Sequence, residues 1–224
     1  LLAVVGSMVY SLIVAMLLNR KIPARGFFRA AFYLPYVLPA AAVYIGWSWL
    51  YNTEWGLFNY ILSKLGIERL MFVSSSSQVV PSLALIAVWL SGNLIVIFLA
   101  GLQNVPRVYH EAAEIDGANW WQIFTKITMP YIIFVLTPYL ITTFTGNVNN
   151  FNVIYLLTRG DPAVVGDSAG KTDLLITWLY KLTVDNNDYN LGAVIGIMTF
   201  VVLAVVSLIT YRSSGSYKNE EAFR

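Results

Sequence analysis

Long apolar stretches alternate with short polar segments along the 224-residue chain. Five stretches lack Asp, Glu, Lys and Arg, and they cover roughly residues 1 to 19, 32 to 52, 82 to 103, 131 to 151 and 190 to 211. About 20 predominantly apolar residues cross the hydrocarbon core of a bilayer as an α-helix. A charge at the bilayer centre costs about 2.5–3.5 kcal/mol on insertion scales. The pattern therefore predicts an all-α membrane protein with five transmembrane helices.

The second predicted span combines two prolines with a cluster of aromatic side chains. Pro35 and Pro39 lie in its first turns, where they indicate either a kinked or late-starting helix or a functional hinge. At the other end of the span the chain carries Trp47, Trp49, Tyr51 and Trp55. Amphipathic rings prefer the level of the lipid headgroups, so this end is expected to lie at a membrane surface.

The Lys and Arg residues predict the orientation of the spans. With five spans, one side of the membrane receives nine of them: Arg20, Lys21, Arg25, Arg29, Arg107, Lys126, Arg212, Lys218 and Arg224. The other side receives five, in longer loops that also carry seven acidic residues: Lys64, Arg69, Arg159, Lys171 and Lys181. Lys and Arg accumulate on the cytoplasmic side. Residues 104 to 130 and the C-terminus are therefore predicted to be cytoplasmic, in a bacterial inner or plasma membrane protein.

Composition supports the membrane class and excludes several kinds of site. Hydrophobic residues make up 58% of the chain, charged residues only 12%, and the mean hydropathy is +0.65, whereas soluble domains carry about 25% charged residues. A formal net charge of +2 gives no reason to expect a nucleic-acid partner. The chain has no cysteine and one histidine, His110, so neither a disulfide framework nor a metal site is expected. Because it opens on Leu1 and not on Met, we expect a fragment that lacks its start.

The segment VVGDSAGKTDLL is close to a phosphate-binding loop, which has the pattern G-x-x-x-x-G-K-[ST] and follows a β-strand. Here Gly166 and Gly170 leave one residue too few, and Val165 stands where the first Gly is needed. The predicted topology also places the segment outside the cytoplasm, away from ATP. Thr172 is instead expected to cap a short external helix with Asp173 in its first turn. The chain is therefore not expected to be an ATPase.

The cytoplasmic connection between the third and fourth spans, NVPRVYHEAAEIDGANWWQIFTKITMP, is long for an idle loop. Residues Arg107 to Asp116 continue without a helix breaker, and Gly117 supplies a C-terminal turn. Residues 118 to 127 are predicted to form a second short helix that ends before Pro130. A helical hairpin between two spans is expected.

The first helix of this hairpin is thin and acidic. Ala112 and Ala113 allow another surface to approach closely, and Glu111 shares a face with Glu114 and is available to a cation of a partner. The alternative is a hairpin lying flat on the headgroups, with an apolar face formed by Trp120, Trp121, Ile123, Phe124 and Ile127. Interfacial helices favour Lys and Arg on their polar face, so the acidic helix disfavours this alternative.

The hairpin resembles the cytoplasmic signature of binding-protein-dependent ABC importer permeases, E-A-A-x(3)-G-x(9)-I-x-L-P. The chain matches it throughout except that Met129 replaces the usual Leu. In that family this segment is the coupling helix, which docks in a cleft of the ATP-hydrolysing subunit. The resemblance implies that Glu111 contacts this subunit and that Gly117 forms the turn. The implied coupling residues are Glu111, Ala112, Ala113, Asp116, Gly117, Ile127 and Pro130.

The resemblance extends over essentially the whole chain and points to one kind of subunit within the family. FYLPYVLPAAAVYIGWSWLYN, TPYLITTFTGNVNNFNVIYLLTRGDP and AGKTDLLITWLYKL are similar to the larger membrane subunit of maltose/maltodextrin-type importers. This implies one transmembrane domain over residues 1–224, with a cytoplasmic tail at 212–224 and one of six core spans missing before Leu1. It also implies a second permease subunit, two copies of a cytoplasmic ATPase that uses ATP and Mg²⁺, and an extracytoplasmic sugar-binding protein. No cofactor is expected on this chain itself.

The fourth predicted span contains a polar stripe in its last turns, TTFTGNVNNF. An amide or hydroxyl left unpaired in hydrocarbon costs several kcal/mol, so these side chains imply a wet cavity. Thr143, Asn147 and Asn150 fall on one stripe at about 100° per residue, with Gly146 beside it. Neutral donors and acceptors suit sugar hydroxyls. The alternative is that they join neighbouring helices by hydrogen bonds.

The resemblance assigns the same stripe to a sugar site. Three of the implied substrate-binding residues come from the third span, where Leu94 directly follows the segment WLSGN. The full set is Leu90, Ser91, Leu94, Thr143, Gly146, Asn147 and Asn150. Leu94 and Gly146 stand where the maltose-type subunit has aromatic residues that stack on pyranose rings. Either a wider pocket or a sugar held mainly by the binding protein would follow from this difference.

We therefore expect a permease subunit of an ABC importer for an oligosaccharide, of the maltodextrin kind, and not an enzyme. A galacto-oligosaccharide, a polyol or glycerol phosphate is the alternative solute, and the absence of Arg and Lys from the stripe disfavours the last. A membrane-embedded transferase would need a carboxylate pair, a metal cluster or a nucleophile beside a base, whereas every acidic residue lies in a loop. A channel or structural protein does not account for the coupling segment.

Overall fold

The computed structural model describes residues 2–213, apart from the side chains of Phe134, Val135, Thr137, Pro138, Leu140 and Ser213. All regular elements in this range are helical, which confirms the predicted all-α class. The predicted cytoplasmic tail lies outside the described residues from position 214 onward. In chain order the elements are α1 Leu2–Asn19, α2 Arg25–Val37, α3 Ala40–Leu50, α4 Leu57–Lys64, α5 Val79–Trp89, α6 Gly92–Asn104, α7 Arg107–Ile115, α8 Trp120–Ile123, the π-helix η1 Phe124–Thr128, α9 Met129–Val148, α10 Phe151–Leu157, α11 Leu175–Tyr180, the π-helix η2 Lys181–Asp185, and α12 Tyr189–Ser213.

The second predicted span is two helices, α2 and α3, which meet at 95°. Leu38 is extended, with φ −66° and ψ 144°, and Pro39 precedes α3. A proline disfavours the α conformation in the residue before it, so the helix ends there. The kinked-helix interpretation of this span is thus confirmed. The helix also begins at Arg25, seven residues before the expected start.

The third predicted span also bends, by 51° between α5 and α6. The bend falls at Leu90 and Ser91, which the sequence analysis placed inside one continuous span. The Ser91 hydroxyl donates to the Val88 carbonyl at 2.6 Å, and the Ser11 hydroxyl of α1 donates to the Ser91 hydroxyl at 2.9 Å. Such local bonds compete with the helical ladder, and a neighbouring side chain holds the break in place.

Two helices within residues 2–213 are long and apolar enough to cross a membrane, Leu2–Asn19 and Tyr189–Arg212. If each bent pair is one span, the number in this part of the chain rises to four. The fourth predicted span, residues 131 to 151, coincides with α9, which has 20 residues. The total of five spans stays a prediction.

Two buried clusters hold the helices together. One joins α1, α6 and α9 through side chains that include Val14, Leu18, Phe98 and Ile132. The other joins α3, α5 and α10 through Val43, Tyr44, Trp47, Tyr51, Ile86, Val153 and Ile154. By contrast, α12 packs mainly against α9 and α11 and leaves many apolar side chains exposed, as a helix facing lipid or a second subunit would.

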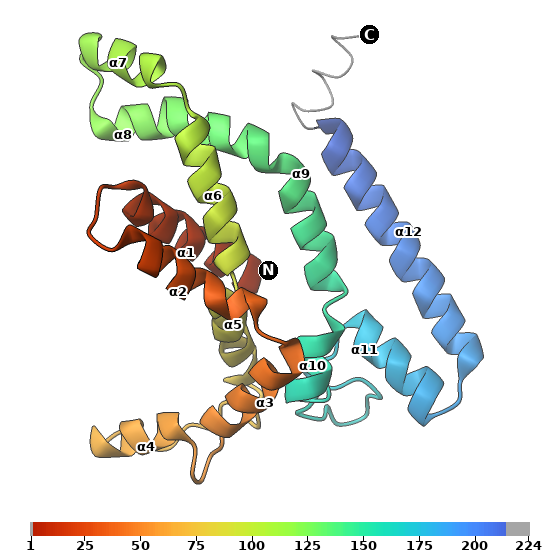
Figure 1. Ribbon diagram of the computed structural model, residues 1–224. Coiled ribbons are helices and arrows are strands. Elements are labelled where there is room, and N and C mark those ends of the chain that lie inside the picture. The colour runs from red at the N-terminus through yellow and green to blue at the C-terminus, as the bar shows by residue number, and fades with distance from the viewer. Residues whose placement is uncertain (1, 214–224) are drawn as a thin grey trace.

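The ends of the helices divide into two groups (Figure 1). The hairpin of α7 and α8, which is the predicted coupling segment, lies at one end of the molecule, together with the C-terminal end of α12. The amphipathic helix α4 and the loop after α10 lie at the opposite end. The hairpin and the end of α12 thus lie together, as the Lys and Arg distribution predicted, while the side of the membrane that they face stays a prediction.

Gly92 permits the close crossing of α2 and α6. A Cβ at this position would fall against the carbonyl oxygen of Phe32 and 3.0 Å from the Cα of Tyr33. Both are backbone atoms, so α2 would have to move. We expect Gly92→Ala to destabilise the fold by about 1–3 kcal/mol, the usual cost of overpacking. Gly46→Ala, with nothing within 4 Å of the added Cβ, is the control; thermal unfolding of the purified protein in detergent, followed by tryptophan fluorescence, compares them.

Candidate translocation cavity and coupling hairpin

A cavity of about 400 Å³ lies between the two buried clusters, where α1, α2, α3, α5, α6, α9 and α10 approach one another. Six of the seven residues predicted for the sugar site contribute to its lining: Leu90, Ser91, Leu94, Thr143, Asn147 and Asn150. The breaks in the helices build this space, because Leu90 and Ser91 form the α5–α6 bend and Asn150 lies between α9 and α10. Gly146 is exposed and lies outside the lining, since a helical residue one position before Asn147 is rotated about 100° away from it.

Three tyrosines that the sequence analysis did not single out also line the cavity: Tyr36, Tyr44 and Tyr139. Asn93 lies beside them and donates a hydrogen bond from Nδ2 to the Tyr139 hydroxyl at 3.0 Å. These tyrosines supply aromatic rings to the cavity from α2, α3 and α9. A usable signal was present, namely polar aromatic residues at membrane depth in FYLPYVLPAAAVY.

The polar stripe makes its hydrogen bonds locally. Thr142 and Thr145 donate to the carbonyls of Tyr139 and Ile141 in their own helix. Asn147 Nδ2 donates to the Thr143 carbonyl at 2.8 Å. Asn150 Oδ1 accepts a 3.5 Å bond from the Val153 amide and caps α10. Since these bonds stay within residues 139 to 153, they do not support the alternative in which the stripe joins neighbouring helices.

Each of the two cavity amides retains a free group. Among residues 2–213, Asn147 Oδ1 and Asn150 Nδ2 have no hydrogen-bond partner in the protein. One is an acceptor and the other a donor, so each can form a hydrogen bond with a hydroxyl group. The described side chains that line the cavity include no Asp, Glu, Lys, Arg or His. The arrangement therefore suits a neutral, polyhydroxylated solute.

The coupling hairpin has the predicted turn and a free surface. Helix α7 has no buried residue, and Asp116 follows it as the C-cap, one residue earlier than expected. Gly117 has φ +76°, the left-handed conformation that ends many helices. Glu111 and Ala112 are exposed, and Ile115 is 86% exposed, which is unusual for an isoleucine with no partner.

The second helix of the hairpin differs from the prediction. It begins at Trp120 and not at Ala118, because Asn119 caps it: Asn119 Oδ1 accepts from the Gln122 amide at 2.9 Å, and Gln122 Oε1 accepts from the Asn119 amide at 2.8 Å. It also does not end before Pro130 but continues through η1 into α9.

The π-helical turn explains how the chain passes Pro130. Proline has no N–H for the fourth preceding carbonyl, and its ring crowds that turn. The wider turn of η1, residues Phe124–Thr128, directly precedes it and relieves the crowding. Ile127 is half-buried within η1. As a result one helical path runs from the coupling hairpin to Thr143 and Asn147 at the cavity.

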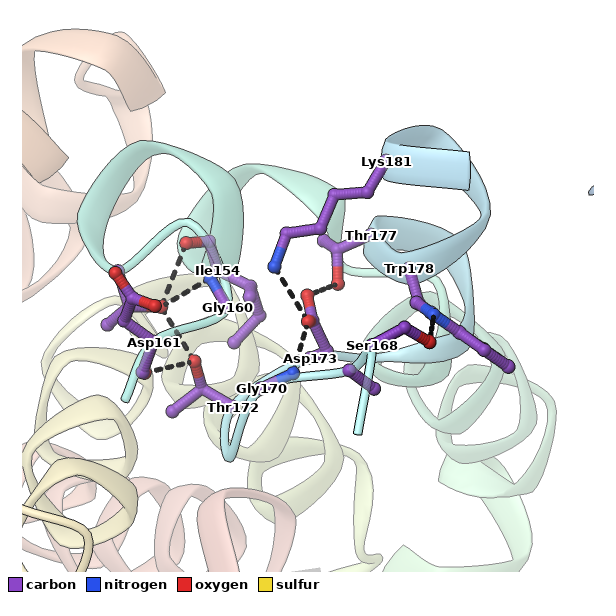
Figure 2. Close-up of polar contacts among 12 residues, drawn as sticks. Ile154, Gly160, Asp161, Ser168, Gly170, Thr172, Asp173, Thr177, Trp178 and Lys181 are labelled. Atoms are coloured by element: carbon purple, nitrogen blue, oxygen red, sulfur yellow. Dashed lines mark hydrogen bonds and ion pairs between the residues drawn. The ribbon is translucent and has the colours of Figure 1, made fainter. Parts of the chain in front are cut away.

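The segment at residues 164 to 175, whose sequence is similar to that of a phosphate-binding loop, has a different architecture (Figure 2). Thr172 does not cap the following helix, and Asp173 does not lie in its first turn, because this helix begins at Leu175. Its hydroxyl instead donates to the Asp161 carbonyl and lies 2.8 Å from the Thr158 hydroxyl. The reason is backbone pairing: the amides of Lys171 and Thr172 donate to the carbonyls of Pro162 and Gly160 and hold this segment away from the helix axis.

Asp173 organises the loop. Its carboxylate accepts from the Gly170 amide at 2.7 Å, from the Thr177 hydroxyl at 2.9 Å and from Lys181 Nζ at 2.7 Å. The Asp173 side chain is only 2% exposed, so this ion pair is largely shielded from water. Lys171 stands where a phosphate-binding loop has its lysine. It is exposed, and its side chain takes no part in the ion pair with Asp173.

We expect Lys171→Ala to leave ATP hydrolysis by the assembled protein unchanged, because the loop provides no phosphate cradle at this lysine. Nucleotide affinity and hydrolysis rate of the assembled complex would be measured before and after the change. Loss of nucleotide binding would contradict both the predicted topology and the local geometry.

Comparison with known proteins places these features in one family. The chain is 36% identical over 209 residues to the galactooligosaccharides transport system permease protein GanP of Bacillus subtilis. This match covers 92% of the chain and 50% of GanP. It is 33% identical to the maltodextrin transport system permease protein MdxF of the same organism (95% and 51%), and 34% identical to the maltose/maltodextrin permease MalF of Vibrio vulnificus (95% and 42%). The chain thus spans about half the length of these relatives, which are transport permeases and not enzymes.

A solved structure shares the fold. A chain in the crystal structure of a bacterial alginate ABC transporter, in complex with an alginate pentasaccharide-bound periplasmic protein, superposes with a TM-score of 0.79 at 23% identity, over 95% of this chain and 74% of that chain. The family model described as "Binding-protein-dependent transport system inner membrane component" matches residues 7–215. The chain therefore belongs to the family of inner membrane components of binding-protein-dependent transport systems.

Proposed function

We propose that this chain forms the translocation path of an ABC importer for a neutral oligosaccharide and couples that path to ATP hydrolysis by a separate subunit. The observation that carries the proposal is the cavity: six residues predicted from the polar stripe and the third span surround one space lined without charge. Three tyrosines add the amphipathic rings that suit sugar rings.

The partners of the proposed complex follow from the free surfaces. The exposed hairpin of α7 and α8 is the proposed docking element for the ATPase, and α12 has an apolar face that a second permease subunit or lipid would cover. The loops at the opposite end of the molecule would face an extracytoplasmic binding protein (Figure 1). ATP and Mg²⁺ would be used by the ATPase and not by this chain.

The chemistry of the cavity narrows the solute class. Alginate, a polymer of sugar acids, and glycerol phosphate would each call for a fixed cation, and the described lining residues include none. A galacto-oligosaccharide is proposed as a solute in addition to a maltodextrin, because the galactooligosaccharide permease is 36% identical to this chain. Both are neutral and rich in hydroxyl groups, so the absence of charge in the lining fits either class equally.

The test is sugar-stimulated ATPase activity and uptake by the complete complex in proteoliposomes, with its binding protein present. Malto-oligosaccharides, galacto-oligosaccharides, alginate oligosaccharides and glycerol phosphate would be compared at equal concentration. We expect stimulation by one of the two neutral classes. Stimulation by the anionic solutes alone, or by none of the four, would contradict the proposal.

A further inference from the structure

Two arginines at the start of α2 converge on one neutral acceptor. Arg25 and Arg29 are four residues apart and so share a helix face. With the Gln103 amide in the orientation that satisfies its neighbours, its oxygen accepts from Arg25 Nη2 at 2.8 Å and from Arg29 Nη2 at 2.9 Å. Two guanidinium groups that share an acceptor repel each other unless an anion is nearby.

The described part of the chain supplies no such anion. The ion pair found within residues 2–213 is that of Lys181 with Asp173, on another part of the molecule. The first acidic residue of the sequence is Glu54. The Nε atoms of Arg25 and Arg29 are also buried without a hydrogen-bond partner. Buried donors nearly always have a partner, so this pair of arginines lacks an acceptor that the complete assembly would provide.

An apolar groove of about 160 Å³ leads away from the arginines along α6. Arg29, Tyr33 and Gln103 supply its polar lining, and its apolar lining combines the exposed Val96 and Ala100 with the buried Leu18, Ile95 and Leu99. Gln103 is in the last turn of α6, whereas Ile95 lies eight residues earlier, about 12 Å along the helix axis. The groove is thus cationic at the end of the helix and apolar toward the middle.

We propose that this groove binds an anionic phospholipid, with its phosphate at Arg25 and Arg29 and part of an acyl chain against the apolar walls. Charge complementarity favours this occupant: residues 20 to 29 carry four cations and no acid. Basic pockets between helices at a membrane surface are suited to acidic headgroups. Phe27 and Phe28, 70% and 41% exposed, flank the arginines with apolar rings that lipid would cover. The proposal does not depend on which solute the protein carries.

The test measures lipid retained by the purified complete complex. The complex would be exchanged into nanodiscs of phosphatidylcholine containing phosphatidylglycerol, released into detergent, and analysed by native mass spectrometry. We expect phosphatidylglycerol to remain bound to the normal complex. The double variant Arg25→Gln/Arg29→Gln should weaken its retention about 30-fold, equivalent to about 2 kcal/mol at about 1 kcal/mol for each arginine. Arg212→Gln, an exposed arginine at the end of α12, is the control for charge and should retain the lipid.

A second variant and a competitor identify the ligand. Ala100 lines the groove, and Ala100→Leu narrows it without changing charge, so it should also reduce lipid retention. Excess inorganic phosphate should not displace the lipid. Full displacement by phosphate together with normal retention by Ala100→Leu would replace the lipid by a simple anion and overturn the proposal. Equal lipid retention in the double variant and Arg212→Gln would also overturn it. A double variant that loses the second permease subunit but keeps its lipid would overturn it as well, because the arginines would then pair with that subunit.

Discussion

Gly117→Arg is expected to abolish solute uptake while the protein still inserts and assembles. Gly117 has φ +76°, and nothing lies within 4 Å of a Cβ built on it. The first carbon of the new side chain therefore meets no clash within the chain, and the left-handed conformation costs only about 1–2 kcal/mol in a non-glycine residue. A complete loss of transport would thus have to come from a partner surface that the new side chain obstructs. Uptake and ATP hydrolysis by the same proteoliposomes measure it, and hydrolysis should lose its dependence on the solute.

Two matched variants separate docking from backbone strain. Gly166→Arg introduces the same side chain at an open, exposed glycine with φ +84°, in the loop at the opposite end of the molecule, and uptake should continue. Gly117→Asn keeps the turn, because Asn tolerates the left-handed conformation, and it should transport nearly normally. Glu111→Lys tests the exposed acidic face of α7 and should uncouple as Gly117→Arg does. Normal uptake by both Glu111→Lys and Gly117→Arg would contradict the proposed coupling role of the hairpin.

The apolar pattern predicted the helical class and the approximate span limits, but not where the helices bend. Charge-free runs report hydrophobic length, and this property is the same for a straight helix and for two helices at 95°. Pro39 gave a visible signal of the bend after α2. The bend at Ser91 depends on a hydrogen bond from Ser11, 80 residues away in sequence, and no local pattern reports such a contact.

Local rules failed where distant backbone or a rare helix type decided the conformation. Thr172 is a good capping residue by type, yet pairing of its segment with residues 160 to 162 places its hydroxyl elsewhere. Pro130 is a sound stop signal for an α-helix, yet η1 allows the helix to continue. The polar stripe was predictable because amides at membrane depth need partners. Tyr44 carried a weaker signal, because a polar aromatic residue at membrane depth shares its apolar ring character with ordinary buried residues.

The stripe itself leads to the second large effect, on the solute concentration needed for uptake. Asn147 is the cleaner target of the two cavity amides. Its Nδ2 bonds only to its own helix, at the Thr143 carbonyl, so Asn147→Ala removes no hydrogen bond between helices. Asn150 also caps α10, and its loss should cost about 0.5–2 kcal/mol of stability as well. Asn149→Ala, an exposed neighbour that does not line this cavity, is the control for both.

We expect Asn147→Ala to raise the half-saturating solute concentration by several-fold to about 100-fold, with normal yield of the assembled complex. A neutral hydrogen bond contributes about 0.5–1.5 kcal/mol, and a hydroxyl left without its partner costs about 1–3 kcal/mol, at about 1.4 kcal/mol per factor of ten. Asn150→Ala should shift affinity by a similar factor but with reduced yield, because the cap is lost too. Asn149→Ala should change neither quantity. If instead both cavity variants assembled poorly and the surviving complex kept its normal half-saturating concentration, the amides would be helix contacts, and the cavity would lose its assignment as the solute path.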